Sequence, residues 1–143
     1  MVCQSIRPNT DGMKACGSSS YRWSNIYCKN AEINTSDRKL KENIEPVSEK
    51  YIDLFDKITP VSYKLVSGDR THIGFVSQEV EEKMGEVGLT DMDFGGFCKD
   101  KFKDEEGNEV ERYGLRYGEF IGIMAAKIKQ LEERIAALEG VEK

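Results

Sequence analysis

A seven-residue repeat of apolar side chains limits what this chain can fold into more than any other feature of its sequence. The repeat consists of Tyr117, Ile121, Met124, Ile128, Leu131, Ile135 and Leu138, spaced alternately four and three residues apart. From residue 121 onward isoleucine occupies each a position and methionine or leucine each d position, as in a coiled coil. A helix that packs only on its own domain shows a wider apolar stripe. The pattern therefore predicts a helix over residues 117–139 that associates with copies of itself through Ile121, Met124, Ile128, Leu131, Ile135 and Leu138.

Charged residues beside this repeat indicate how the helices are oriented. Lys127 and Arg134 fall at g positions, and Glu132 and Glu139 fall at the e positions five residues later. Such pairs of opposite charge are typical of a parallel coiled coil. A core helix within a single chain is the alternative. Isoleucine at a with leucine at d favours dimers, but an attached domain can override that preference, so the copy number stays open.

Composition bounds the size of the fold and the class of partner. The chain has 143 residues, of which 38% are hydrophobic and 33% charged, so one modest domain with an appendage is expected. A net charge of −5 argues against binding to nucleic acid or to an anionic membrane. No apolar run approaches the roughly 18 residues of a membrane helix, and the N-terminus lacks the apolar core of a signal peptide.

The cysteines and motifs indicate neither a metal site nor a cofactor. Cys3, Cys16, Cys28 and Cys98 are far apart, without a CxxC pair, and His72 is the single histidine. We predict reduced thiols, with a disulfide framework as the alternative. The sequence holds no GxxxxGK[ST], GxGxxG or HExxH motif, and no metal or cofactor is expected.

The chain divides by composition into residues 1–35 and residues 36–143. The first part is rich in Ser, Asn and Gly and has too few large apolar residues for a core of its own. We interpret it as disordered, or as the β-rich end of a fibre that completes its core with neighbouring chains. The second part predicts an α+β domain with a small, mostly antiparallel sheet, short helices and the long C-terminal helix.

Six elements are predicted before the long helix. Residues 48–58 have a helical period, with Ser48 as N-cap and Pro60 after the end, and residues 78–85 form a short helix that Gly85 stops. Segments 61–66 and 72–77 are predicted strands. Residues 91–102 and 108–117 flank a polar loop, as in a hairpin.

The stretch NTSDRKLKENI, residues 34–44, permits two interpretations. On local physics Ser36 is first of all a helix N-cap, with Asp37 favourable beside a helix N-terminus and a solvated charge run behind it. The alternative is a Ser36–Lys41 dyad, in which a neutral lysine removes the proton of the serine hydroxyl. An S-x4-K pattern alone is weak, because it occurs by chance in many proteins.

The order of motifs resembles the peptidase S74 family, the auto-processing intramolecular chaperone domains at the C-termini of phage tail spikes, tail fibres and neck appendages. The resemblance runs from about Ser36 to Glu139 and rests on SDRKLKENI, PVSYKL, HIGFVSQEVEE and the terminal coiled coil. It implies a homotrimer that helps the upstream fibre segment of the same chain to fold. It also implies self-cleavage between Thr35 and Ser36, with Ser36 as nucleophile and Lys41 as general base.

Three further expectations follow from this resemblance. The precursor is a virion protein, from which residues 36–143 are released in the host cytoplasm. The Ser36 hydroxyl attacks the Thr35 carbonyl, in an N-to-O acyl shift or by assisting water. The oxyanion stabiliser is a backbone amide or the side chain of Asn34 or Asn43, and His72 is a packed strand-end residue rather than a catalytic one.

Two other classes of protein stay open at this stage. A non-enzymatic trimerisation or capping module that remains attached needs the coiled coil but not the Ser36 hydroxyl. A membrane-tethered transcription factor that uses the same processing domain is disfavoured by the missing apolar span and by the fibre-like residues 1–35.

Overall fold

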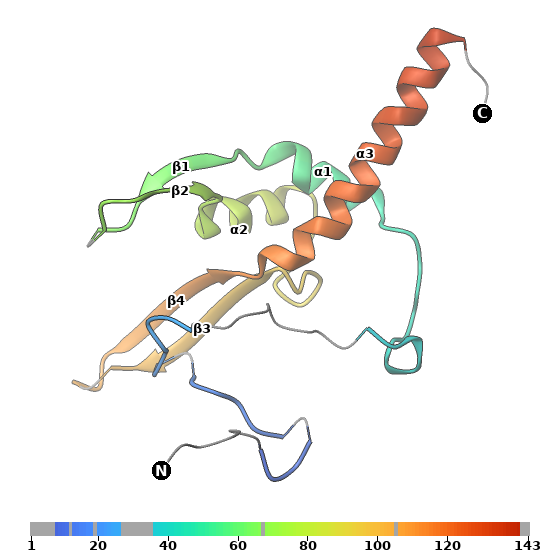
Figure 1. Cartoon of the computed structure of the whole chain (residues 1–143). Coiled ribbons are helices and arrows are strands. Elements are labelled where there is room, and N and C mark those ends of the chain that lie inside the picture. The colour runs from blue at the N-terminus through green and yellow to red at the C-terminus, as the bar shows by residue number, and fades with distance from the viewer. Residues whose placement is uncertain are drawn as a thin grey trace. The chain divides into compact units, whose positions relative to one another are not determined.

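The chain divides into two units in the computed structural model, which describes residues 8–11, 13–18, 20–26, 36–66, 68–104 and 106–140. One unit comprises Met1–Thr35 with Lys101–Val110, and the other comprises Ser36–Asp100 with Glu111–Lys143. The helices and both hairpin sheets appear in Figure 1. The predicted α+β class with a long C-terminal helix is confirmed.

Three helices form the framework of the second unit. They are α1 (Glu49–Lys57), α2 (Ser77–Glu86) and α3 (Tyr117–Glu139), and α1 packs against both α2 and α3. Their apolar faces meet in one core, because the period of each helix brings its large side chains to one side. The core consists of Leu54, Ile58, Val80, Met84, Leu89, Phe94, Phe97, Phe120 and Ile123.

The first hairpin is tied to the start of α3. Strands β1 (Val61–Lys64) and β2 (Thr71–Gly74) pair antiparallel, with Val61 opposite Gly74. The Phe75 amide, just after β2, donates to the Tyr117 hydroxyl at 3.1 Å. A Cβ on Gly74 would lie 2.2 Å from that hydroxyl, so glycine is needed for this close approach.

The second hairpin follows the FGGF sequence at residues 94–97. Strands β3 (Phe97–Lys103) and β4 (Glu109–Leu115) pair in a second two-stranded sheet. The polar loop between them is closed by the Asp104 amide, which donates to the Asn108 carbonyl at 3.0 Å. Gly96 is required for core packing, because a Cβ there would lie 2.3 Å from the Phe94 ring.

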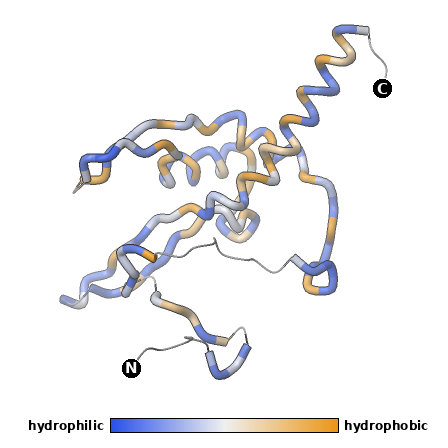
Figure 2. The backbone as a smooth tube through the Cα atoms, in the orientation of Figure 1, coloured by the Kyte–Doolittle hydropathy of each residue, from blue (hydrophilic) through white to orange (hydrophobic). Residues whose placement is uncertain are grey.

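Helix α3 has one face on the core and one face in solvent. Phe120 and Ile123 are buried, whereas the predicted contact residues Ile121, Met124, Ile128, Leu131, Ile135 and Leu138 are between 39% and 80% exposed. Apolar residues recur along α3 beyond the part that packs on the domain (Figure 2). The exposed set, called the seam below, is an apolar face without a partner in the described part of this single chain. Tyr117 differs from the seam, because its hydroxyl accepts a hydrogen bond from the Phe75 amide, just after β2.

Lys127, predicted to pair with Glu132 of another chain, instead forms an ion pair within its own chain. The Lys127 amine pairs with the Asp56 carboxylate of α1 at 2.6 Å. Gln130, one turn later, donates to Glu49 at 3.4 Å. These contacts fasten the middle of α3 to α1 and leave Arg134 with Glu139 as the predicted pair beyond the domain.

One expectation about local structure was wrong, because Gly85 does not end the short helix. Gly85 lies inside α2, which ends before Gly88, where a positive φ of 70° lets the Leu89 amide bond the Met84 carbonyl. Ser48 occupies the N-cap position of α1 but makes no side-chain cap bond. Residues 8–11, 13–18 and 20–26 contain no strand, although a turn is closed by the Ser18 amide and the Tyr21 carbonyl. A segment with so few apolar residues cannot build a sheet by itself.

Among the described residues, no helix is long and apolar enough to cross a membrane. These residues also contain no group of three or more His, Cys, Asp or Glu side chains that could hold a metal ion. Cys16 and Cys98 are free thiols, whereas Cys3 and Cys28 lie outside the described ranges.

Candidate functional site

A short 3₁₀ turn, η1 (Arg38–Leu40), shapes the chain around the predicted dyad. Asp37 is its N-cap, with extended backbone angles of −68° and 132°, and its carboxylate accepts from the Lys39 amide at 2.9 Å. The Leu40 amide donates to the Asp37 carbonyl at 3.0 Å, and the Lys41 amide donates to the Arg38 carbonyl at 3.2 Å. These bonds reverse the chain between Ser36 and Lys41.

This reversal brings the two predicted catalytic side chains together. The Lys41 Nζ atom donates to the Ser36 Oγ atom over 2.7 Å. That distance is within the range that proton transfer between a nucleophile and its base requires. Ser36 is therefore not the helix N-cap that its local sequence predicted, because Asp37 occupies the N-cap position. The Ser36 hydroxyl instead contacts the Lys41 amine.

The dyad lies in solvent in this single chain. Every residue from Ser36 to Lys50 is exposed, including the apolar Leu40 at 74% and Ile44 at 53%. No packed side chain therefore restrains the dyad within this described segment, and its geometry depends on the local hydrogen bonds. Two exposed apolar residues beside a reactive pair are suited to burial by another surface.

The arrangement is chemically suited to attack on the bond that precedes Ser36. The Lys41 ammonium donates a hydrogen bond to the Ser36 hydroxyl. A lysine that has lost its proton would instead accept the hydroxyl proton, across the same distance, and raise the nucleophilicity of the oxygen. A serine hydroxyl reaches the carbonyl carbon of the preceding residue through a five-membered ring, so the nucleophile and its target are already tethered.

The remaining predicted site residues are dispersed. Thr35 and Asn34 lie outside the described residues. Asn43 has a positive φ of 51°, a conformation that asparagine tolerates better than most residues. His72 lies on β2, exposed, with its ring stacked on Tyr63 at 5.6 Å between centroids. His72 was expected to be packed or hydrogen-bonded at a strand end, and it is instead an exposed residue with a ring contact to the neighbouring strand.

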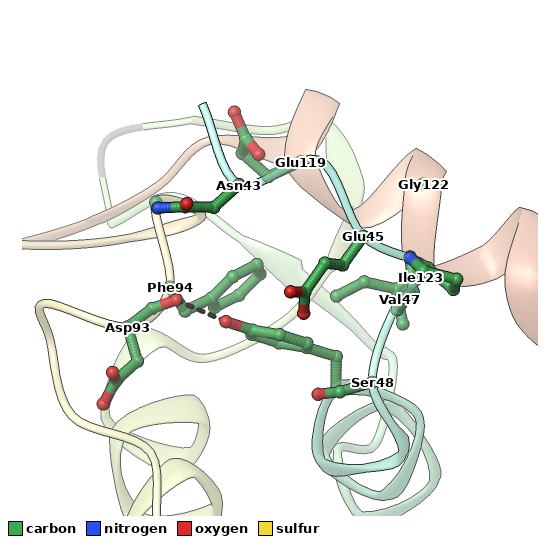
Figure 3. Close-up of a pocket in the computed structure, with 12 residues that line it drawn as sticks. Asn43, Glu45, Val47, Ser48, Asp93, Phe94, Glu119, Gly122 and Ile123 are labelled. Carbon is green, nitrogen blue, oxygen red and sulfur yellow. Dashed lines mark hydrogen bonds between the residues drawn. The ribbon is translucent and has the colours of Figure 1, made fainter. Parts of the chain in front are cut away.

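A pocket of about 510 Å³ lies just after the dyad segment. Its walls come from residues 43–48, the start of α1, the loop at 93–95 and α3, as Figure 3 shows. The Tyr51 hydroxyl closes one side by donating to the Asp93 carbonyl at 2.6 Å. The pocket places Glu45 and Glu119 beside Phe94 and Ile123, so it combines carboxylates with an apolar floor.

Groups with a clearly shifted pKa stabilise other parts of the fold. Two hydrogen bonds from Thr90 hold the pKa of Asp93 below its usual value. The side chain of Lys83, followed by that of Lys57, lowers the pKa of Glu86.

The pKa of Lys99 is shifted in the opposite direction. Tyr113 is the largest cause of the rise in the pKa of Lys99, followed by Glu81. The Lys99 amine lies 5.0 Å from the centre of the Tyr113 ring and forms a 3.0 Å ion pair with Glu81 of α2. It therefore links β3 to α2 and β4.

The structural roles of two residues were not predicted from the sequence. Asp37 was noted only for its charge, although its place before three residues of turn is a regular N-cap signal. Tyr117 was placed in the apolar repeat, and no signal in its spacing reveals that its hydroxyl bonds the backbone after β2.

Comparison with protein families gives one match within the second unit. Residues 36–89 match the model of the peptidase S74 family, described as the chaperone of endosialidase. The match begins at Ser36, the first member of the dyad.

Two curated phage proteins resemble the chain in sequence. It is 26% identical over 156 residues to the tail spike protein of Escherichia virus K5, covering 93% of this chain and 25% of that protein. It is 34% identical over 98 residues to the capsule K3-specific depolymerase 1 of Klebsiella phage KP32, covering 64% of this chain and 11% of that protein. The chain thus spans a quarter or less of these relatives.

Two solved structures share the fold. The carboxy-terminal domain of the bacteriophage T5 L-shaped tail fibre with its intramolecular chaperone domain superposes with a TM-score of 0.76 and 24% identity, covering 96% of this chain and 39% of that one. A novel intramolecular chaperone superposes with a TM-score of 0.58 and 27% identity, covering 68% of this chain and 99% of that one.

Proposed function

Since residues 36–89 belong to the peptidase S74 family, the chaperone of endosialidase, we propose that this chain carries a self-cleaving intramolecular chaperone of a phage tail fibre or spike. Residues 36–143 form the chaperone domain, and residues 1–35 are the end of the fibre on which it acts. The observation that carries the proposal is the 2.7 Å contact between Lys41 Nζ and Ser36 Oγ at the first residue of the family match.

The seam supplies the chaperone activity in this account. Its six apolar residues are exposed on a helix whose other face is already occupied by the core. Burying them against two further copies forms a parallel trimeric coiled coil, which brings three fibre segments into register. The resemblance of the chain to phage tail spike proteins supports this role in a virion precursor. In this account the precursor assembles in the host cytoplasm.

Cleavage then separates the chaperone from the fibre. Neutral Lys41 takes the proton from the Ser36 hydroxyl as its oxygen attacks the Thr35 carbonyl carbon. The carbon–nitrogen bond between Thr35 and Ser36 breaks, and the lysine returns the proton to the departing amine. Water hydrolyses the resulting ester and leaves a carboxylate on Thr35 and a free hydroxyl on Ser36. Asn43 or a backbone amide stabilises the oxyanion.

Assembly precedes cleavage in this scheme. The dyad is exposed in the single chain, and so are Leu40 and Ile44 beside it. Contacts with neighbouring copies would cover these side chains, exclude water and hold the dyad more rigidly. The order also has a purpose, since a chaperone that left before its fibre was in register would be useless.

A test of the proposed function compares wild-type protein with Ser36→Ala, both expressed with residues 1–35 attached. We expect the wild type to yield fragments 1–35 and 36–143 on a denaturing gel, whereas Ser36→Ala remains whole. Ser36→Ala should sediment as a trimer of the whole chain, because Ser36 contributes nothing to the core or to the seam. A whole wild-type trimer would instead identify a trimerisation module that stays attached.

A further inference from the structure

We propose that Asp37 is a positioning residue for self-cleavage: its side chain closes the turn that holds the Lys41 amine against the Ser36 hydroxyl. This inference rests on the proposed Ser36–Lys41 dyad. It assigns a role to Asp37, which lies between Ser36 and the turn η1. Asp37 does not touch the reacting atoms in this role. It acts through the backbone of the turn.

The hydrogen bonds around η1 form a continuous chain from Asp37 to the dyad. The Asp37 carboxylate accepts from the Lys39 amide at 2.9 Å. The Asp37 carbonyl accepts from the Leu40 amide at 3.0 Å, and the Arg38 carbonyl accepts from the Lys41 amide at 3.2 Å. The next link is the 2.7 Å contact between the Lys41 and Ser36 side chains. Within the turn, the side-chain bond of Asp37 is the link that depends on residue type, because the other two bonds of the turn involve backbone atoms only.

Packing offers no substitute for this bond in the single chain. The turn η1 has no buried residue, and every residue from Ser36 to Lys50 is exposed. A turn of three residues gains little from its own backbone bonds, since each ordered residue loses conformational entropy. An N-cap acceptor is therefore a large share of what keeps the turn closed, and a misplacement of about 1 Å at a reacting group can cost on the order of 100-fold in rate.

The choice of substitutions follows from the cap preference. Asparagine is as good an N-cap as aspartate, because its side-chain oxygen accepts the same amide, whereas alanine has no acceptor. Asp37→Asn therefore keeps the bond and removes the charge, and Asp37→Ala removes both. Glu42→Ala is the matched control, since it removes one carboxylate next to Lys41 but outside the bonds of η1.

The experiment measures the first-order rate of cleavage of the full chain over a range of pH. Asp37→Ala should cleave about tenfold more slowly, the factor that corresponds to a cap worth about 1.4 kcal/mol. Asp37→Asn should restore the rate to within about twofold, and Glu42→Ala should cleave at the wild-type rate. The shape of the pH profile should stay unchanged in Asp37→Ala, because the base is still Lys41.

A second measurement reports the turn itself. In a Ser36→Ala background, which keeps the chain whole, Asp37→Ala should speed hydrogen exchange of the Lys39 amide by several-fold, while Asp37→Asn should not. The melting temperature should be equal in both, because residues 36–48 contribute no side chain to the core.

The outcomes separate this inference from the function on which it rests. A wild-type rate in Asp37→Ala overturns the positioning role. So does an Asp37→Asn rate as low as that of Asp37→Ala, because the charge and not the turn would then matter. If Ser36→Ala itself cleaves at the wild-type rate, the dyad is wrong and the positioning role fails with it. If Ser36→Ala stays whole while Asp37→Ala cleaves at the full rate, the positioning role of Asp37 is rejected and the Ser36–Lys41 dyad is retained.

Discussion

The dyad segment and the helical core are stabilised in opposite ways. In the core, residues distant in sequence bury one another: Phe120 of α3 meets Phe94 at 5.2 Å and Phe75 at 5.4 Å between ring centroids. In the segment from Ser36 to Lys41 all contacts lie within five residues, and every side chain is exposed. Tertiary packing thus fixes the fold, whereas local hydrogen bonds fix the candidate site.

This difference predicts that stability and the proposed self-cleavage can be changed separately. We expect a substitution in the core to alter the free energy of unfolding, and a substitution in the dyad segment to alter the proposed chemistry with little effect on folding. The seam connects the two properties, because assembly through the seam would also bury the exposed dyad. Each prediction below either separates the two regions or tests that connection.

The largest effect is expected from removing an aromatic ring from the core. Phe120→Ala should lower the free energy of unfolding by about 3–5 kcal/mol, because Phe120 is 2% exposed and its removal leaves a cavity. Glu42→Ala, in the exposed segment just after the dyad, is the control and should change it by less than about 0.5 kcal/mol. Chemical denaturation of both variants in the Ser36→Ala background gives the comparison. Equal losses in the two variants would show that the segment is packed after all.

The next effect concerns the base. Lys41→Arg keeps a cation beside Ser36, but a guanidinium stays protonated near neutral pH, so cleavage should slow by about 10²-fold or more. The wild-type rate should rise with pH until the Lys41 amine is neutral. Unfolding of Lys41→Arg should match the Ser36→Ala protein. A cleavage rate that is flat between pH 6 and 10 would reject a lysine base.

The seam variant tests the connection between assembly and chemistry. Ile128→Asp with Ile135→Asp places two charges on the exposed apolar face of α3 without touching the buried Phe120 and Ile123. We expect a folded monomer that cleaves on the order of 100-fold more slowly, since the dyad loses its cover. Lys129→Asp with Ala137→Asp, off the seam, should remain assembled and active. Sedimentation reports the mass, and a denaturing gel reports the cutting. A monomer that cleaves at full rate would refute gating by assembly.

The smallest effect is an acid dependence of the fold. The pKa of Asp93 is lowered by hydrogen bonds from Thr90, so these bonds add stability above the ordinary pKa of 3.8 and lose it as pH falls through the folded-state pKa. Asp93→Asn should therefore flatten the fall in melting temperature below about pH 4, relative to the otherwise identical protein. An unchanged slope would mean that other carboxylates dominate the acid response.

The sequence predicted those elements whose signals are periodic. The α1 and α3 helices were predicted from the regular spacing of their apolar residues. The exposure of Ile128 and Ile135 agrees with an apolar repeat that packs against other chains. The end of α2 was missed because Gly85 and Gly88 are both possible stops, and only backbone geometry distinguishes them.

Contacts between distant residues could not be predicted in the same way. The Lys127–Asp56 and Tyr117–Phe75 contacts depend on how α3 lies against α1 and β2, which no local pattern encodes. In the dyad segment the spacing of Ser36 and Lys41 permitted a contact, but the choice between cap and nucleophile needed the position of Asp37.

Mass spectrometry of the assembled chain in the presence of hydroxylamine tests the central claim most directly. If the Ser36 oxygen attacks its own amide bond, the trapped ester must yield residues 1–35 ending in a Thr35 hydroxamate. The companion fragment must begin at Ser36 with a free amine, and Ser36→Ala must give neither product. Cleavage at any other bond, or the same two fragments from Ser36→Ala, would contradict self-cleavage by the Ser36–Lys41 dyad.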